Sequence, residues 1–360
     1  MNIKKGQLAI SGWQKCFDHF CWTMKDARLC QMPEASRQNP ELFKTMTTAL
    51  QTNTTLYQDI FNSIDFEKII DHPNILIAAH FWEPERYQAA RNCYQFMRAI
   101  DDLIDNYKTE HITIADQDKA SFEAQVYHWI NSVVESSDDD KARVELMDTV
   151  HRFCLPLWPL EAFARSMIYD IYNDGFPTLQ SFIEYAGGAS VAPASIFVHL
   201  CGLTKKEDKY YPPVFDVKRV STPCAIFSYL VHIIRDFQKD HLNHLNYFGN
   251  DLMEKNGLTR ELLLQMAQGA PVTAGFRELV RELMAVADVY RRETYEMIQE
   301  IRPFLEPRCQ LSLEIIFTLY LMVFERIDIE NGSFTTKELN PTPQEIKERV
   351  WKTIMEFEAQ

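Results

Sequence analysis

Two short acidic segments, residues 101–105 and 236–240, carry side chains whose types and spacing could do chemistry. The first reads Asp-Asp-Leu-Ile-Asp and the second Asp-Phe-Gln-Lys-Asp. Residues four apart in a helix share a face, with Cβ atoms about 5–6 Å apart, so Asp101 would lie beside Asp105 and Asp236 beside Asp240. Two carboxylates ~6 Å apart repel by roughly 3 kcal/mol at an effective dielectric near 20. Several of them in one cleft would therefore need counter-cations.

The counter-cation that this pattern favours is Mg²⁺. Magnesium prefers oxygen ligands, keeps several waters, and is usually bound by one or two carboxylates together with substrate phosphate oxygens. An arginine precedes each segment, Arg98 and Arg235, and the planar guanidinium matches the geometry of phosphate oxygens. The two segments predict a site that binds a diphosphate group and promotes its departure.

The segments fall on stretches with helical periodicity, residues 89–106 and 226–240. In the first, one face of the expected helix carries Tyr94, Arg98, Asp101 and Asp105. Apolar residues occupy another face. The second is expected to be one helix that carries His232, Asp236 and Asp240 at steps of four. For either segment alone, the alternative interpretation is that its acids are simply solvated or paired with a nearby arginine. Two segments with the same row of acids on one helix face favour a shared site.

Composition predicts an all-α protein. Only 11 of the 360 residues are glycine, so few tight turns are expected. The hydrophobic content of 46% is enough for a large core. Prolines at 84, 156, 159, 177, 212, 213 and 303 mark helix starts and connections. We expect a single helical domain over residues 1–360, with a family-like core at 72–350 and an N-terminal extension, 1–70, to which no motif assigns a role.

Several classes of function are disfavoured. The net charge of −14 argues against a nucleic-acid partner, which would need basic surfaces. The eight cysteines show no CxxC pairing, and no secretory signal or run of 18 apolar residues occurs, so we expect reduced thiols, a cytoplasmic location and no membrane span. No dinucleotide-binding fingerprint indicates NAD(P)H. The oligomeric state stays open.

The residues of these motifs resemble the squalene/phytoene synthase family of isoprenoid synthases. The resemblance covers roughly residues 72–350 and rests on the two acidic segments with their arginines. Tyr247-Phe248, Asp251-Leu252 and Gly257-Leu258 look like the family's "YLP…DL…GL" tail, and residues 185–194, expected to form one helix of small residues, look like its "YCxxVAGxVG" segment. Asp170 also falls where the family carries an aspartate.

The resemblance implies an all-α isoprenoid-synthase bundle around a central cavity, where two prenyl diphosphates are joined head to head. It implies two or three Mg²⁺ ions, with Asp101, Asp102, Asp105, His232, Asp236 and Asp240 as the candidate ligands. Substrate contacts would come from His72, Arg98, Asp170, Tyr229, Arg235 and Tyr247, and Tyr94 and Tyr185 would lie near the reacting carbons. Aromatic rings attract cations, and Phe197 is a further candidate ring. An apolar product would partition into lipid, so peripheral contact with a membrane is also expected.

The sequence departs from the family at four positions that matter for function. Tyr229 and His232 stand where the family has Gln and Asn, and imidazole is a poor match for Mg²⁺. Asn74 and Leu245 stand at two positions expected to be basic. Two alternatives follow: an enzyme that binds one diphosphate and cyclises the cation or transfers it to another acceptor, and a non-catalytic relative that acts as a binding partner. The intact aspartates speak against the second, which would gain support if Asp236→Asn left cellular function unaffected.

Overall fold

The chain divides into two compact units, Met1–Asp59 and Ile60–Gln360. The computed structural model describes residues 55–68, 74–111, 113–134 and 141–357. In the first unit only residues 55–59 are described, and they are helical. The site residues discussed below belong to the second unit, except that His72, a predicted substrate contact, lies outside the described residues.

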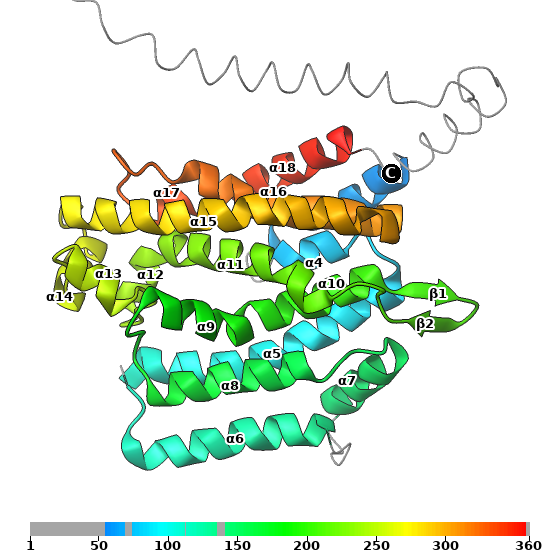
Figure 1. Cartoon of the computed structure of the whole chain (residues 1–360), viewed down its shortest axis with the longest axis horizontal. Helices are drawn as coiled ribbons and strands as arrows, with labels where there is room; N and C mark the ends of the chain where they lie inside the picture. The colour runs from blue at the N-terminus through cyan, green and yellow to red at the C-terminus, as the bar shows by residue number, and fades with distance from the viewer. Residues whose placement is uncertain (1–54, 69–73, 112, 135–140, 358–360) are drawn as a thin grey trace, which may run out of the picture. The chain divides into compact units, whose positions relative to one another are not determined.

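The second unit confirms the predicted all-α class (Figure 1). Its first seven labelled helices are α4 (Asn74–Ala79), α5 (Pro84–His111), α6 (Asp116–Val134), α7 (Lys141–Arg152), α8 (Trp158–Tyr172), α9 (Leu179–Ala189) and α10 (Val191–Gly202). After a short hairpin come α11 (Val217–Arg235), α12 (Phe237–Leu242), α13 (Asn250–Lys255), α14 (Arg260–Ala267), α15 (Ala274–Ile301), the 3₁₀ turn η2 (Arg302–Phe304), α16 (Pro307–Arg326), α17 (Thr336–Leu339) and α18 (Pro343–Glu356).

Helix boundaries follow the expected chemistry. Pro84 and Pro307 open α5 and α16, where their missing N–H and fixed φ cost nothing. The Thr178 side chain accepts a hydrogen bond from the Ser181 amide and caps α9, and Asp216 caps α11 in the same way through the Arg219 amide. These caps fix where the helices that carry the site residues begin.

One hairpin interrupts the helical pattern, between α10 and α11. Strands β1 (Thr204–Lys206) and β2 (Lys209–Tyr211) pair antiparallel. Its turn uses no glycine: Glu207 takes a left-handed backbone conformation with φ of 53°. The scarcity of glycine therefore limited hairpins along the described chain without excluding this one.

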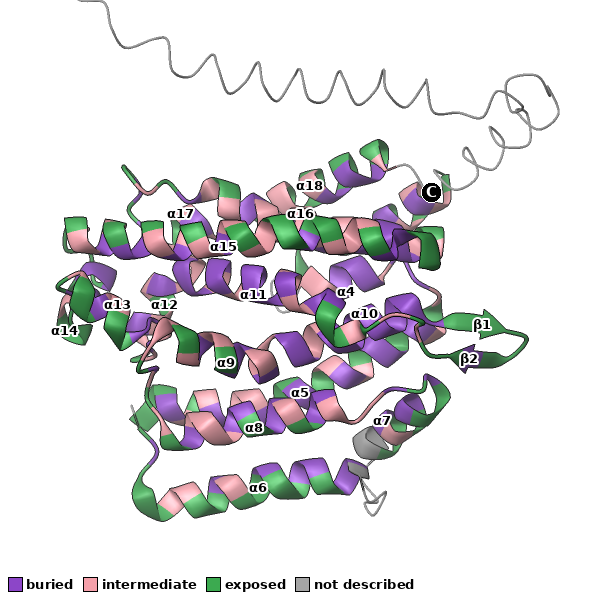
Figure 2. Cartoon of the chain, viewed as in Figure 1, coloured by how far each residue is buried: buried purple, intermediate pink, exposed green. Residues whose placement is uncertain are grey.

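The helices stack in layers, and α11 lies at the centre (Figure 1). It packs against α15 and α16 on one side and against α9 and α10 on the other, while α8 joins α9 and α10 to α5 and α6. Buried residues face inward along each of these helices (Figure 2). The helix α16 is long and apolar enough to cross a membrane, but 61% of its most apolar window is buried inside the fold, as in a core helix.

The structure corrects two of the predicted helices. Residues 226–240 are not one helix: α11 ends at Arg235, and Asp236, with φ of −91° and ψ of 4°, separates it from α12. Residues 185–194 are also divided, because α9 ends at Ala189 and Ser190 links it to α10. No proline marks the first break, so helical periodicity could not reveal it, whereas at the second break Pro193 lies in the first turn of α10 and was a usable signal of a helix start.

Candidate active site

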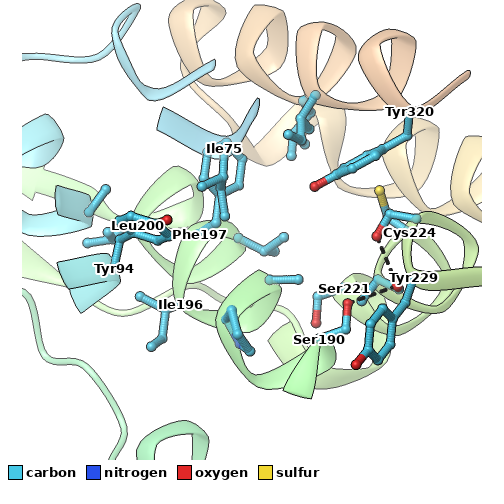
Figure 3. A pocket seen from close by; sticks show the side chains of 18 of the residues that line it. Ile75, Tyr94, Ser190, Ile196, Phe197, Leu200, Ser221, Cys224, Tyr229 and Tyr320 are labelled. Atoms are coloured by element: carbon cyan, nitrogen blue, oxygen red, sulfur yellow. Dashed lines mark hydrogen bonds between the residues drawn. The ribbon is translucent and has the colours of Figure 1, made fainter. Parts of the chain in front are cut away.

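A cavity of about 340 Å³ lies between α5, α10, α11, α15 and α16. That volume falls in the range of roughly 300–1,000 Å³ common for small-molecule pockets. Its lining is mostly apolar. Figure 3 shows Ile75, Tyr94 and Phe197 on one side, and Cys224, Tyr229 and Tyr320 on the other. Charged lining comes from Arg98 and Asp101, so the cavity joins an apolar interior to a charged edge.

The helix α5 brings Tyr94, Arg98 and Asp101 to this cavity. Arg98 Nη1 donates a 2.9 Å hydrogen bond to Asp101 Oδ2, and Arg98 also pairs with Asp102, whose side chain is 42% exposed. Asp105 lies one turn further on and lines a separate small hollow together with Lys108, Asp170 and Tyr247. The predicted stripe on α5 is therefore divided between the cavity and this hollow.

The end of α11 and the start of α12 form the second acidic cluster. Arg235 holds Asp236 in a two-pronged contact, with Nε to Oδ1 at 2.7 Å and Nη2 to Oδ2 at 2.6 Å. Burial opposes ionisation of Asp236, but this hydrogen bonding and the arginine charge outweigh it and lower its pKa. Asp236 is thus held as a carboxylate.

The pKa shifts of the acids show that the two clusters lie within electrostatic range of each other. The pKa of Asp240 is raised to about 7, mainly by burial and also by the charges of Asp236 and of Asp105 on α5. The pKa of Asp101 is likewise raised to about 7, mainly by burial and then by the charge of Asp105. Lys239 on α12 acts in the opposite direction on the pKa of Asp105. Residues more than a hundred positions apart therefore form one crowded acidic region.

Asp170 joins this region from α8. Its pKa is raised to about 7, mainly by burial and to a smaller extent by the charges of Asp105 and Asp101. The charge of Lys108 and a hydrogen bond from Tyr185 act in the opposite direction. Tyr185 donates that bond at 2.5 Å. Tyr185 is absent from the described lining of the cavity; its ring packs instead against Phe176, with ring centroids 5.0 Å apart.

Lys108 is a charged site residue that the sequence analysis missed. Its side chain is buried, and Nζ donates to the Asn173 carbonyl at 2.9 Å and lies 3.9 Å from Asp174. Its charge lowers the pKa of both Asp105 and Asp170. The signal was present, because Lys108 follows Asp105 by three positions and Asp101 by seven, on the same helix face.

His232 lies at the cavity wall, one turn before Asp236. Burial and the positive charge of Arg235 lower its pKa to about 3, so the imidazole is neutral near pH 7. Its ring packs edge-on against Tyr320, with centroids 5.1 Å apart. Tyr229, another of the four departures from the family pattern, also lines the cavity.

The donor set can be tested against Mg²⁺. Among the residues that the structure describes, no three His, Cys, Asp or Glu side chains are grouped closely enough to hold an ion by themselves. Magnesium is usually held by one or two carboxylates, with phosphate and water completing its shell. Burial and mutual repulsion both oppose ionisation of these acids. A bound cation offsets the burial penalty and the repulsion, so these acids suit this way of binding Mg²⁺.

Comparison with known proteins addresses the family and the fold of the chain. The chain matches the family model for squalene/phytoene synthase over residues 72–344. No curated protein matches the sequence. Three solved structures share the fold at low identity. A dehydrosqualene synthase in complex with ligand has a TM-score of 0.59 and 16% identity, over 84% of this chain and 98% of that one.

The chain is also similar to two further solved structures. Squalene synthase HpnC from Alicyclobacillus acidocaldarius has a TM-score of 0.56 and 13% identity, over 77% of this chain and 94% of its own. YisP from Bacillus subtilis has a TM-score of 0.53 and 14% identity, over 84% and 98%. At these identities the structures show a shared fold, and the family match covers most of the chain. The chain belongs to the squalene/phytoene synthase family.

Proposed function

We propose that this protein is a Mg²⁺-dependent prenyltransferase that ionises an allylic prenyl diphosphate and joins the prenyl group to a second prenyl diphosphate. The observation that carries this proposal is the meeting of the two acidic clusters: the charge of Asp105 on α5 reaches Asp240 on α12. Asp101 belongs to the same crowded group and lines an apolar cavity.

In this proposal the aspartates hold the metal and the metal holds the diphosphate. Asp101 and Asp105 would bind Mg²⁺ from α5, and Asp236 and Asp240 from the junction of α11 and α12. Bound Mg²⁺ supplies positive charge that stabilises the leaving diphosphate. Arg98 and Arg235 are both paired with aspartates; once a metal takes those carboxylates, their guanidinium groups become available to phosphate oxygens.

The apolar cavity would receive the prenyl chain and exclude water from the cation. Tyr94, Phe197 and Tyr229 line it, and aromatic faces attract a cation by roughly 0.5–2 kcal/mol each. Asp170, fixed by Tyr185 and close to Lys108, would hold the acidic region in position rather than touch the prenyl carbons. The solved structures named dehydrosqualene synthase and squalene synthase support coupling of two prenyl groups.

Diphosphate release tests the proposal directly. The full chain would be incubated with Mg²⁺ and geranyl, farnesyl or geranylgeranyl diphosphate, and released diphosphate and extracted hydrocarbons measured. We expect metal-dependent release and a hydrocarbon with twice the carbon number of the donor. Absence of release with all three donors would refute the proposal.

One set of observations favours a single-diphosphate enzyme of the same fold as the second candidate. Leu245, at a position expected to be basic, lines the hollow beside Asp105, and Asn74 opens α4 without positive charge. Less positive charge leaves less support for a second diphosphate. A terpene of the donor's own length, or a prenylated acceptor, would identify this activity in the same extract.

A further inference from the structure

An exposed apolar patch lies where the segment after β2 meets the turn η2. It consists of Tyr211, Val214, Phe215 and Phe304. Val214 is 78% exposed and Phe304 is 55% exposed, and the ring centroids of Phe215 and Phe304 lie 6.4 Å apart, which joins the two segments into one surface. Isolated exposed apolar residues are ordinary, whereas a group of them marks an interaction site.

The apolar patch borders the end of the cavity that is remote from the acidic region. Val220, five positions after Phe215, and Ile301, three positions before Phe304, both line the cavity. Twelve positions of α11 separate Val220 from His232 at the acidic end, which is about 18 Å at a rise of 1.5 Å per residue. Figure 1 shows the hairpin projecting from the end of the helical layers opposite α12–α14. The cavity therefore extends from the acidic region toward the apolar patch.

Three exposed lysines border the apolar patch: Lys206, Lys209 and Lys218, hereafter the border lysines. The Lys206 ammonium lies 5.6 Å from the ring centroid of Tyr211, and Lys218 stands three positions after Phe215. Lys206 and Lys209 are paired across the hairpin. Like charges at facing positions of a sheet destabilise it, so an anion bound beside them would relieve the repulsion.

This end of the molecule is locally positive, in contrast to the whole chain. Residues 204–219 contain five basic and three acidic side chains, in a chain of net charge −14. Two of the basic residues pair with glutamates of α5 and α15. The border lysines form no salt bridge with any carboxylate in the described part of the chain, so their charges are open to an external anion.

We propose that this end of the molecule binds the surface of an anionic lipid bilayer. The apolar patch would enter the layer where head groups meet acyl chains, and the border lysines would lie at the lipid phosphates. The binding itself needs no catalysis. Its purpose rests on the proposed function, because an apolar product formed in the cavity would leave into lipid at this end while the acidic region stays in water.

Charge favours a bilayer over a second copy of this chain as the occupant. In a two-fold symmetric dimer the same surface lies on both subunits, so the border lysines of the two copies would face and repel each other. Lipid phosphates supply the opposite charge. An anionic surface would repel the remainder of this acidic chain, which would limit contact to the apolar patch and its border.

Two double variants test the two properties of this surface separately. Val214→Asp combined with Phe304→Asp removes the apolar character of the patch. Lys206→Glu combined with Lys209→Glu reverses the charge of its border. All four side chains are exposed, so the substitutions leave the core intact, and circular dichroism would verify that each variant is folded.

Matched control pairs make the same chemical changes elsewhere. Val289→Asp combined with Tyr127→Asp alters positions that are 44% and 49% exposed on α15 and α6. Lys337→Glu combined with Lys352→Glu alters exposed lysines of α17 and α18. Each full-length protein would be sedimented with phosphatidylcholine vesicles, with and without phosphatidylglycerol, in the absence of substrate.

We expect the unaltered chain to bind the vesicles that contain phosphatidylglycerol, and to bind them less tightly as salt is added. Each lysine near an anionic bilayer strengthens binding by about 5-fold, so Lys206→Glu with Lys209→Glu should weaken it by at least ~25-fold. Val214→Asp with Phe304→Asp should weaken it by at least ~10-fold, because carboxylates would have to leave water. Both control pairs should bind as the unaltered chain does.

Three results would overturn the inference. They are failure of the unaltered chain to bind phosphatidylglycerol vesicles, equal binding to phosphatidylcholine alone, and equal weakening in a variant and its control pair. Analytical ultracentrifugation supplies a fourth: a dimer that only Val214→Asp with Phe304→Asp dissociates, with vesicle binding unchanged, would make the patch a subunit interface. A chain that binds vesicles but releases no diphosphate would defeat the proposed function alone.

Discussion

The hydroxyl of Tyr185 on α9 donates a 2.5 Å hydrogen bond to Oδ2 of Asp170 on α8. The bond fixes a half-buried carboxyl group beside Lys108, at the hollow that Asp105 also lines. It connects the aromatic interior to the acidic region, since the same tyrosine packs against Phe176 and Tyr229.

Loss of this hydroxyl should destabilise the protein. Tyr185→Phe leaves an Asp170 oxygen without its donor, and an unsatisfied buried polar group costs about 1–3 kcal/mol. The pKa of Asp170 should rise further, because the bond favours its ionised form. Urea unfolding at pH 5 and pH 8 measures both effects, with the larger loss expected at pH 8, where Asp170 is ionised.

Tyr172→Phe is the matched control on α8. The Tyr172 hydroxyl also donates to a carboxylate, Glu123, but the side chain is 48% exposed, and surface substitutions usually change stability by within about 0.5 kcal/mol. Equal losses in the two variants would show that burial of the Asp170–Tyr185 pair is not what makes its hydrogen bond important.

The four proposed metal ligands should be individually essential for diphosphate release. Asp101→Asn, Asp105→Asn, Asp236→Asn and Asp240→Asn should each reduce Mg²⁺-dependent release by more than the roughly 10–100-fold that loss of an outer-shell partner costs. Asp116→Asn, on the 95% exposed side chain of α6 that pairs with Lys119, is the control. Full activity in any of the four would remove that residue from the metal site.

Magnesium should stabilise the protein more at high pH than at low pH. Asp101 and Asp240 have folded-state pKa values of about 7, against about 3.9 unfolded. Between these values the folded state binds more protons, so their contribution to the free energy of unfolding falls as pH rises from about 4 to 7 and stays low above it. Mg²⁺ binds the ionised form and offsets this loss.

Thermal unfolding at pH 5.5 and pH 8, with and without Mg²⁺, measures this effect. The rise in Tm caused by Mg²⁺ should be larger at pH 8, and Asp240→Asn should reduce the difference between the two pH values. The variant is needed as a reference because Asp101 and Asp170, whose pKa values are also raised to about 7, contribute to the pH dependence in the same range. Equal Mg²⁺ effects at both pH values would contradict the prediction.

Filling the cavity should shorten the donor that the enzyme accepts. Ala194 on α10 lines the cavity, and Ala194→Phe would occupy part of its volume at an overpacking cost of about 1–3 kcal/mol. The ratio of kcat/KM for geranylgeranyl over farnesyl diphosphate should fall. Val289→Phe, at a 44% exposed position on α15, should leave the ratio unchanged; an equal fall in both variants would exclude the cavity as its cause.

The sequence predicted the helical class and the two acidic segments because both depend on local periodicity. Residues Asp101 and Asp105 repeat at helical spacing, so their shared face could be read from position alone. The family match over residues 72–344 confirms the suspected family. The repeated stripe and the family resemblance both suggested that the segments share a site, but local spacing could not show which of their side chains lie near one another.

Other features depended on tertiary contacts that no local pattern encodes. The break at Asp236 has no proline or glycine to mark it. The hydrogen bond between Tyr185 and Asp170 joins two helices, and the burial of Lys108 results from the packing of α8 and the loop after it. The sequence also could not decide whether Arg98 and Arg235 pair with their neighbouring aspartates, because either side chain could have pointed away from them.

Because of the break between α11 and α12, the two acids of the second segment are held by different helices. Asp236 caps the central helix, whereas α12 packs against α14 and α17. Gln238 ties α12 to both, through the Ala267 carbonyl at 3.1 Å and the Thr336 amide at 2.9 Å. Substitutions around Gln238 would therefore move Asp240 relative to Asp236 without changing any residue that lines the cavity.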